Sequence, residues 1–70
     1  MEKAKKLSWS VRVKIAMLER NMTVAELAKK IGRSRPYVSL VVSGKLIAPP
    51  TNRMISDVLN VSWTEDDYRG

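Results

Sequence analysis

The side chains in this sequence that can do chemistry are mainly cations, and they are concentrated in one part of the chain. Residues 1–45 contain eleven of the thirteen lysines and arginines but only three acidic residues. Residues 46–70 contain two basic and four acidic residues. A cluster of basic residues is typical of a surface that binds a polyanion such as nucleic acid. The alternative interpretation is ordinary surface charge that keeps the protein in solution.

Cysteine and histidine are both missing from the sequence. Without them the chain has no disulfide, no zinc site of the usual kinds and no Ser-His or Cys-His catalytic pair. We therefore expect no enzyme activity, no metal and no cofactor. We also expect no small-molecule ligand.

No apolar run approaches the roughly 20 residues that span a bilayer. Lys3, Lys5 and Lys6 make the start of the chain basic, but no apolar stretch follows them as it would in a secretory signal. We expect a cytoplasmic protein with no membrane partner. It would consist of a basic N-terminal arm (residues 1–8) and one folded domain (residues 9–68). The arm is too short and lacks the amphipathic face for a membrane-surface role.

Apolar residues recur at spacings of three and four, which indicates short helices. The first helix is expected from about Trp9 to Arg20, with Ser8 as its N-cap. It carries two apolar stripes, so we expect it to be buried on two sides. One stripe contains Val13, Ala16 and Met17, and the other contains Val11, Ile15, Leu18 and Met22.

The clearest helix start is the capping box Thr23–Glu26, in which each residue's side chain pairs with the other's backbone amide. Gly32 stands where a left-handed residue ends that helix. The next helix follows at once, capped by Ser34. It is expected to begin properly only at Pro36, because a residue before proline is biased away from the α conformation. Gly44 ends it, and Val38, Val41 and Val42 face inward. Two short helices joined in this way form a helix-turn-helix unit.

Two further helices complete the predicted fold. One is expected from about Asn52 to Leu59, with Thr51 as its cap. The last is a short helix from about Trp63 to Tyr68. The fold class is therefore all-α, a compact five-helix bundle that contains a helix-turn-helix.

The chain from Thr23 to Lys45 resembles the Cro/C1-type (XRE) family of helix-turn-helix regulators. The resemblance is carried by TVAELAKKIG at residues 23–32, RSRPYVS at 33–39 and SGK at 43–45, and it extends over about residues 9–66. It implies a phage-repressor-like protein with a lambda-repressor-like DNA-binding domain. It also implies a sequence-specific transcriptional regulator that binds double-stranded DNA in the major groove. Such a protein would repress by occluding an operator as a dimer.

The resemblance also implies which residues contact DNA. Bases would be read from the start of the second helix of the motif. Arg35 is the strongest candidate, because a guanidinium can donate two hydrogen bonds to guanine. The alternatives are a phosphate contact for Arg35, a core position for Leu40 and a packing or phosphate role for Tyr37. The base-reading candidates are Arg35, Pro36, Tyr37, Ser39 and Leu40. The phosphate-binding candidates are Thr23, Arg33, Ser34, Ser43 and Lys45.

Several positions depart from the family's pattern. Val24 stands where many members have a glutamine that binds phosphate. Met17 and Val42 stand where many members have a buried arginine–glutamate pair. Loss of both charges together is coherent, because either charge alone would be buried without a partner. We expect Met17 to pack on Val42. The loop Leu46–Ala48 is less basic than in some members, which puts contacts between that loop and DNA in doubt.

A dimer is expected to form through the C-terminal segment, around Leu59 to Trp63. Packing in the core is an equally good interpretation of Trp63. The second stripe on the first helix would be covered by Trp63 and Tyr68, or would form a subunit interface. The competing function is a protein-interaction module of the same fold, an antitoxin or an adaptor, that does not read DNA.

Overall fold

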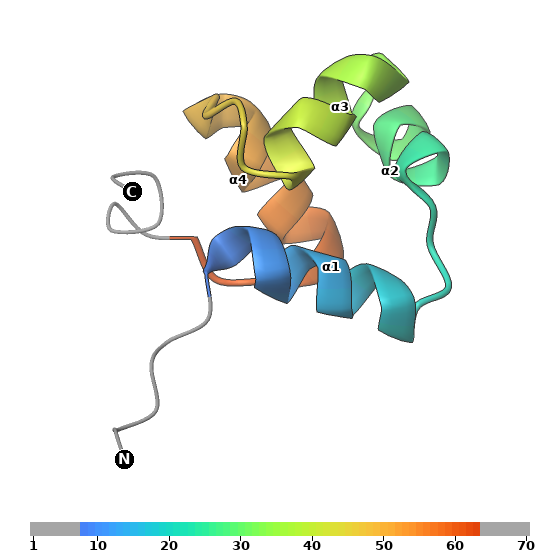
Figure 1. Ribbon diagram of the computed structural model, residues 1–70. Helices are drawn as coiled ribbons and strands as arrows, with labels where there is room; N and C mark the ends of the chain where they lie inside the picture. The colour runs from blue at the N-terminus through green and yellow to red at the C-terminus, as the bar shows by residue number, and fades with distance from the viewer. Residues whose placement is uncertain (1–7, 64–70) are drawn as a thin grey trace.

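The computed structural model describes residues 8–63, and within that range it contains four helices and no strand (Figure 1). Helix α1 spans Trp9–Glu19, α2 spans Val24–Ile31, α3 spans Arg35–Val42 and α4 spans Pro49–Leu59. Helices α2 and α3 lie together at one end, α1 runs below them, and α4 lies behind α1 and α3 (Figure 1). The all-α class is confirmed, but the described residues form four helices where five were predicted. Residues 1–7 of the predicted arm, and the predicted fifth helix beyond Trp63, lie outside the described residues.

The predicted caps of α1 and α2 are confirmed. The hydroxyl of Ser8 accepts a hydrogen bond from the amide of Val11 at 3.3 Å. In the capping box, the amide of Glu26 donates to Thr23 Oγ1 at 3.1 Å, and the amide of Thr23 donates to Glu26 Oε1 at 2.9 Å. These bonds satisfy amides that the helix itself leaves without partners. Local sequence therefore sets where both helices begin.

Helix α3 begins one residue earlier than predicted. Ser34 is its N-cap and accepts from the amide of Tyr37 at 3.4 Å, and Arg35 is already helical. The expectation that the helix begins only at Pro36 is therefore wrong. Pro36 occupies the second helical position, where a missing amide donor costs nothing.

Helix α4 begins three residues earlier than predicted, at Pro49 instead of Asn52. Prolines suit the first turn of a helix because their φ is already helical and no amide donor is needed there. Thr51 is therefore not the cap. The N-cap is Ala48, and its amide donates to Asn52 Oδ1 at 3.0 Å. The prediction failed because it treated the two prolines as part of the loop.

The core lies where the four helices meet. It is built from apolar residues of every helix. Its members are Trp9, Val13, Ala16, Met17, Leu27, Ala28, Val38, Val41, Val42, Ile55 and Leu59. The side chains of Thr51, Asn52 and Ser56 are also buried. No buried side-chain nitrogen or oxygen within residues 8–63 lacks a hydrogen-bond partner.

Three of the four residues in the second apolar stripe of α1 are not buried as predicted, whereas the fourth, Met22, is half-buried against the core. Val11, Ile15 and Leu18 are 41%, 42% and 77% exposed. Trp63, one of the two residues expected to cover this stripe, packs edge-on against Trp9 with ring centroids 5.3 Å apart. The other, Tyr68, lies outside the described residues. Helix α1 is therefore buried on one side within residues 8–63.

Gly32 ends α2 in the left-handed conformation, with φ +72°, and apart from the glycine and its neighbours in the chain no atom lies within 4 Å of the place where a Cβ would stand. Gly32→Ala should therefore cost only backbone strain. We expect it to lower the free energy of unfolding by about 1 kcal/mol. Gly32→Asn should cost less, because asparagine tolerates this conformation. Urea denaturation of the three proteins measures both effects. Equal midpoints for the alanine variant and the parent would contradict the assignment of strain to this residue.

Candidate nucleic-acid interface

Helix α3 has one buried face and one exposed face. Val38, Val41 and Val42 are buried and point into the core. Pro36 and Leu40 are four residues apart on the opposite side, and residues with this spacing share a helix face. The exposed residues of the helix are Arg35, Pro36, Ser39 and Leu40, followed by Ser43 as its C-cap. Four of the five predicted base-reading residues therefore lie on one exposed surface.

The alternative in which Leu40 belongs to the core is wrong, because its side chain is 45% exposed. Three valines already fill the inner face of α3. Leu40 stands on the outer face with Pro36, where an apolar side chain can contact a thymine methyl group.

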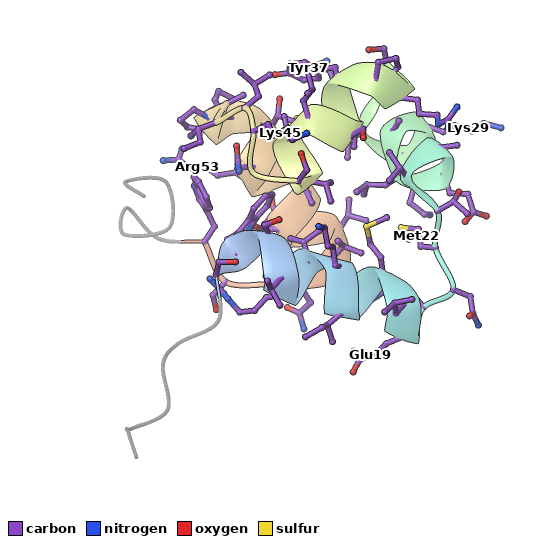
Figure 2. The ribbon with its side chains drawn as sticks, viewed as in Figure 1. Glu19, Met22, Lys29, Tyr37, Lys45 and Arg53 are labelled. Carbon is purple, nitrogen blue, oxygen red and sulfur yellow. The ribbon has the colours of Figure 1, made fainter. Side chains whose placement is uncertain are left out.

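Tyr37 differs from the other four candidates because it is half-buried. Its phenol oxygen lies 3.0 Å from Thr51 Oγ1, at the start of α4. Figure 2 shows Tyr37 on α3 near the beginning of α4. A packing role for Tyr37, one of the two alternatives to base reading, is therefore supported by its contact with Thr51.

The predicted phosphate-binding residues are all exposed, and they lie at the ends of the two helices of the motif. Arg33 and Ser34 precede α3, whereas Ser43 and Lys45 follow it. Thr23 caps α2, and it lines the same groove as Ser43. The fold thus brings the start of α2 close to the end of α3. Donors at these places can contact the backbone of a nucleic acid lying along the exposed face of α3.

The positions that depart from the family's pattern lie together in the structure. Met17, Val24 and Val42 line one groove of about 560 Å³ between α1, α2 and α3. Met17 and Val42 are both buried members of the core, as their predicted contact requires. Val24 is half-buried and packs against the same core. The groove is therefore apolar where many family members carry an arginine, a glutamine and a glutamate.

Two hydrogen bonds between helices hold the scaffold that presents α3. The hydroxyl of Ser10 on α1 donates to the carbonyl of Val42, in the last turn of α3. The indole Nε1 of Trp9 donates to Ser56 Oγ on α4 at 2.8 Å, in a buried position. Because both bonds start from the first turn of α1, this turn fixes the other two helices relative to each other.

The loop after α3 adds two exposed apolar residues that were not among the predicted site residues. The amides of Lys45 and Leu46 both donate to the carbonyl of Leu40, at 3.0 and 3.2 Å. These bonds close the end of α3. Leu46 and Ile47 are exposed, and they line a pocket with Trp9 and Trp63. In the sequence, Leu46 and Ile47 stand out as two adjacent apolar residues that do not fit the apolar spacing of any predicted helix.

A family model described as helix-turn-helix matches residues 13–65. The chain belongs to the Cro/C1-type (XRE) helix-turn-helix family. The suspected resemblance is thereby confirmed. Searches among curated proteins and among solved structures give no match.

Membership makes the protein a DNA-binding transcription regulator by class, and the family is not one of enzymes. The matched range contains both helices of the motif, α2 and α3. Among residues 8–63, no helix has both the length and the apolar character needed to cross a membrane.

Proposed function

We propose that this protein is a sequence-specific repressor that binds an operator in double-stranded DNA as a dimer and occludes a promoter. The observation that carries the proposal is the outer face of α3. Arg35, Pro36, Ser39 and Leu40 are all exposed there, and the core uses none of them. A helix with such a free face fits the major groove, which is about 12 Å wide.

Each of these residues has a proposed role. Arg35 donates two hydrogen bonds to O6 and N7 of a guanine, and Ser39 accepts or donates one hydrogen bond. Pro36 and Leu40 contact thymine methyl groups. Thr23, Arg33, Ser34, Ser43 and Lys45 bind phosphates, which sets the register of the protein on DNA without selecting a sequence.

Two surfaces are candidates for the dimer interface. Leu59 is 1% exposed and belongs to its own core, so a C-terminal interface would have to use the residues that follow it. The exposed stripe of Val11, Ile15 and Leu18 on α1 is the second candidate. In either case the operator would consist of two half-sites about one helical turn apart.

The competing function, a protein-interaction module without DNA reading, is tested by titration. The purified protein is titrated against a random-sequence duplex and against the DNA upstream of its own gene, at 50 and at 200 mM salt. A repressor should bind one site in the upstream DNA at least about a thousandfold more tightly than the random duplex. Its affinity should fall steeply with salt, because phosphate contacts release counterions. Equal and weak binding to both duplexes would reject the repressor and favour the interaction module.

A further inference from the structure

The first turn of α3 carries the proposed guanine-reading residue but has no buried side chain of its own. Arg35 and Pro36 are exposed, and the buried residues Val38, Val41 and Val42 all lie further along the helix. The core therefore fixes the later residues of α3 directly, and the first turn contacts it through the half-buried side chain of Tyr37. Its own cap is a single hydrogen bond of 3.4 Å, from the amide of Tyr37 to Ser34 Oγ.

The side chain that anchors this turn is Tyr37. Its phenol oxygen and Thr51 Oγ1 are 3.0 Å apart and partly buried. Thr51 is 2% exposed, so this partner is shielded from water. A hydrogen bond that is shielded from water is stronger than an exposed one and holds its geometry more tightly.

The partner side of this bond is itself held firmly. Thr51 follows Pro49 and Pro50 in the first turn of α4, where proline fixes φ at the helical value. Asn52, the next residue, is buried and accepts from the amide of Ala48 at 3.0 Å. Ile55, one turn further on, is fully buried in the core. Thr51 is therefore a fixed point to which Tyr37 can attach the first turn of α3.

We propose that Tyr37 is a positioning residue: its hydrogen bond to Thr51 sets the direction in which Arg35 and Pro36 project toward DNA. The inference rests on the proposed function. It gives Tyr37 a role different from base reading. At the other end of the helix, Ser10 binds the carbonyl of Val42, so α3 is held by a side chain at each end. A guanidinium must lie in the plane of its guanine to donate two hydrogen bonds. A small rotation of the first turn therefore affects base discrimination more than it affects phosphate binding.

The test uses variants that alter the hydrogen bond from both sides. Tyr37→Phe and Thr51→Val each remove it and keep the shape of the side chain, whereas Thr51→Ser keeps the hydroxyl. A duplex enriched from a random pool by the parent protein serves as the probe, together with its single-base variants. Selectivity is the ratio of Kd for a single-base variant to Kd for the enriched duplex. We expect Tyr37→Phe and Thr51→Val each to lower the largest selectivity ratio about tenfold. Thr51→Ser should leave it unchanged, and the double variant should be no worse than either single one.

The possible outcomes are separable. Loss of selectivity in Tyr37→Phe alone would mean that the phenol touches DNA directly, and it would overturn the positioning role. Lower melting temperatures with unchanged selectivity would reduce the bond to a structural one, and they would also overturn the inference. If the parent enriches no sequence at all, the proposed function itself fails, and the inference fails with it. Two-dimensional amide NMR spectra of each variant confirm that the fold is retained before binding is compared.

Discussion

Replacing Val42 by glutamate is expected to remove most of the free energy of unfolding. Val42 is 4% exposed and packs within the core that α3 shares with α1 and α2. A carboxylate at this position would be buried without a partner, which costs about 3–5 kcal/mol. Small domains have total stabilities at the low end of roughly 5–15 kcal/mol. Lys14 lines the same groove but is exposed, and a solvated cation compensates a buried carboxylate only weakly.

The informative control is the double variant Met17→Arg/Val42→Glu. Met17 and Val42 line the same groove and occupy the places where many family members have a buried arginine and glutamate. Supplying both charges together should recover much of the stability that the glutamate alone removes, because each charge gains its partner. A second control, Leu40→Glu, places the same side chain on the exposed face of α3 and should change stability little.

Thermal unfolding followed by circular dichroism measures the stability of the parent and of the three variants. A cooperative transition in Val42→Glu at the parent's temperature would contradict the packing of Met17 on Val42. A double variant no more stable than Val42→Glu would show that the groove cannot hold an ion pair. In that case the side chains around Met17 and Val42 would pack differently from those around the buried arginine–glutamate pair of many family members, and the two places would not be equivalent.

The parts of the fold that were predictable from sequence are those fixed by neighbouring residues. The capping box at Thr23 and Glu26, the left-handed Gly32 and the cap at Ser34 all depend on bonds that span a few residues. Such bonds form in the same way wherever the segment lies in a protein. They therefore located α2 and α3, and with them the exposed face that carries Arg35.

The starts of α3 and α4 were missed through the local chemistry of proline, but other missed features depend on residues far apart in the chain. The hydroxyl of Thr51 pairs with Tyr37, fourteen residues away, and nothing near Thr51 in the sequence indicates that partner. The exposed stripe of α1 looks like a second buried face, because apolar spacing does not show whether a partner element exists. Trp63 was one of two residues expected to cover that stripe, but it packs on Trp9 instead. In each case tertiary contacts decide the outcome.

How well the sequence predicts the position of a side chain in the candidate site differs from residue to residue. Leu40 was ambiguous because a leucine in a short helix fits the core as well as the surface. The structure decides the matter, since Leu40 is 45% exposed whereas Val38, Val41 and Val42 are buried. Leu46 and Ile47 could not be placed beside Trp9 and Trp63 from sequence, because the pocket that they share joins segments far apart in the chain.

Arg35→Ala is the second large effect that we expect. It should weaken binding to the preferred duplex by about 1–3 kcal/mol and should abolish the preference for guanine at one position of each half-site. The effect should be large because the rest of the outer face is poor in hydrogen-bonding groups. Pro36 and Leu40 offer only apolar contacts, and Ser39 accepts several bases.

Arg35→Lys separates base reading from the phosphate alternative. Lysine keeps the positive charge but loses the planar pair of donors. If Arg35 binds a phosphate, the lysine variant should bind almost as well as the parent. If Arg35 reads guanine, the lysine variant should lose discrimination almost as fully as Arg35→Ala.

Lys45→Ala is the matched control. It should weaken all duplexes about equally and should reduce the dependence of log K on log salt by about one per subunit. The same uniform loss in Arg35→Ala would place the arginine on the backbone, and the sequence preference would then rest on the apolar contacts of Pro36 and Leu40 and on DNA shape.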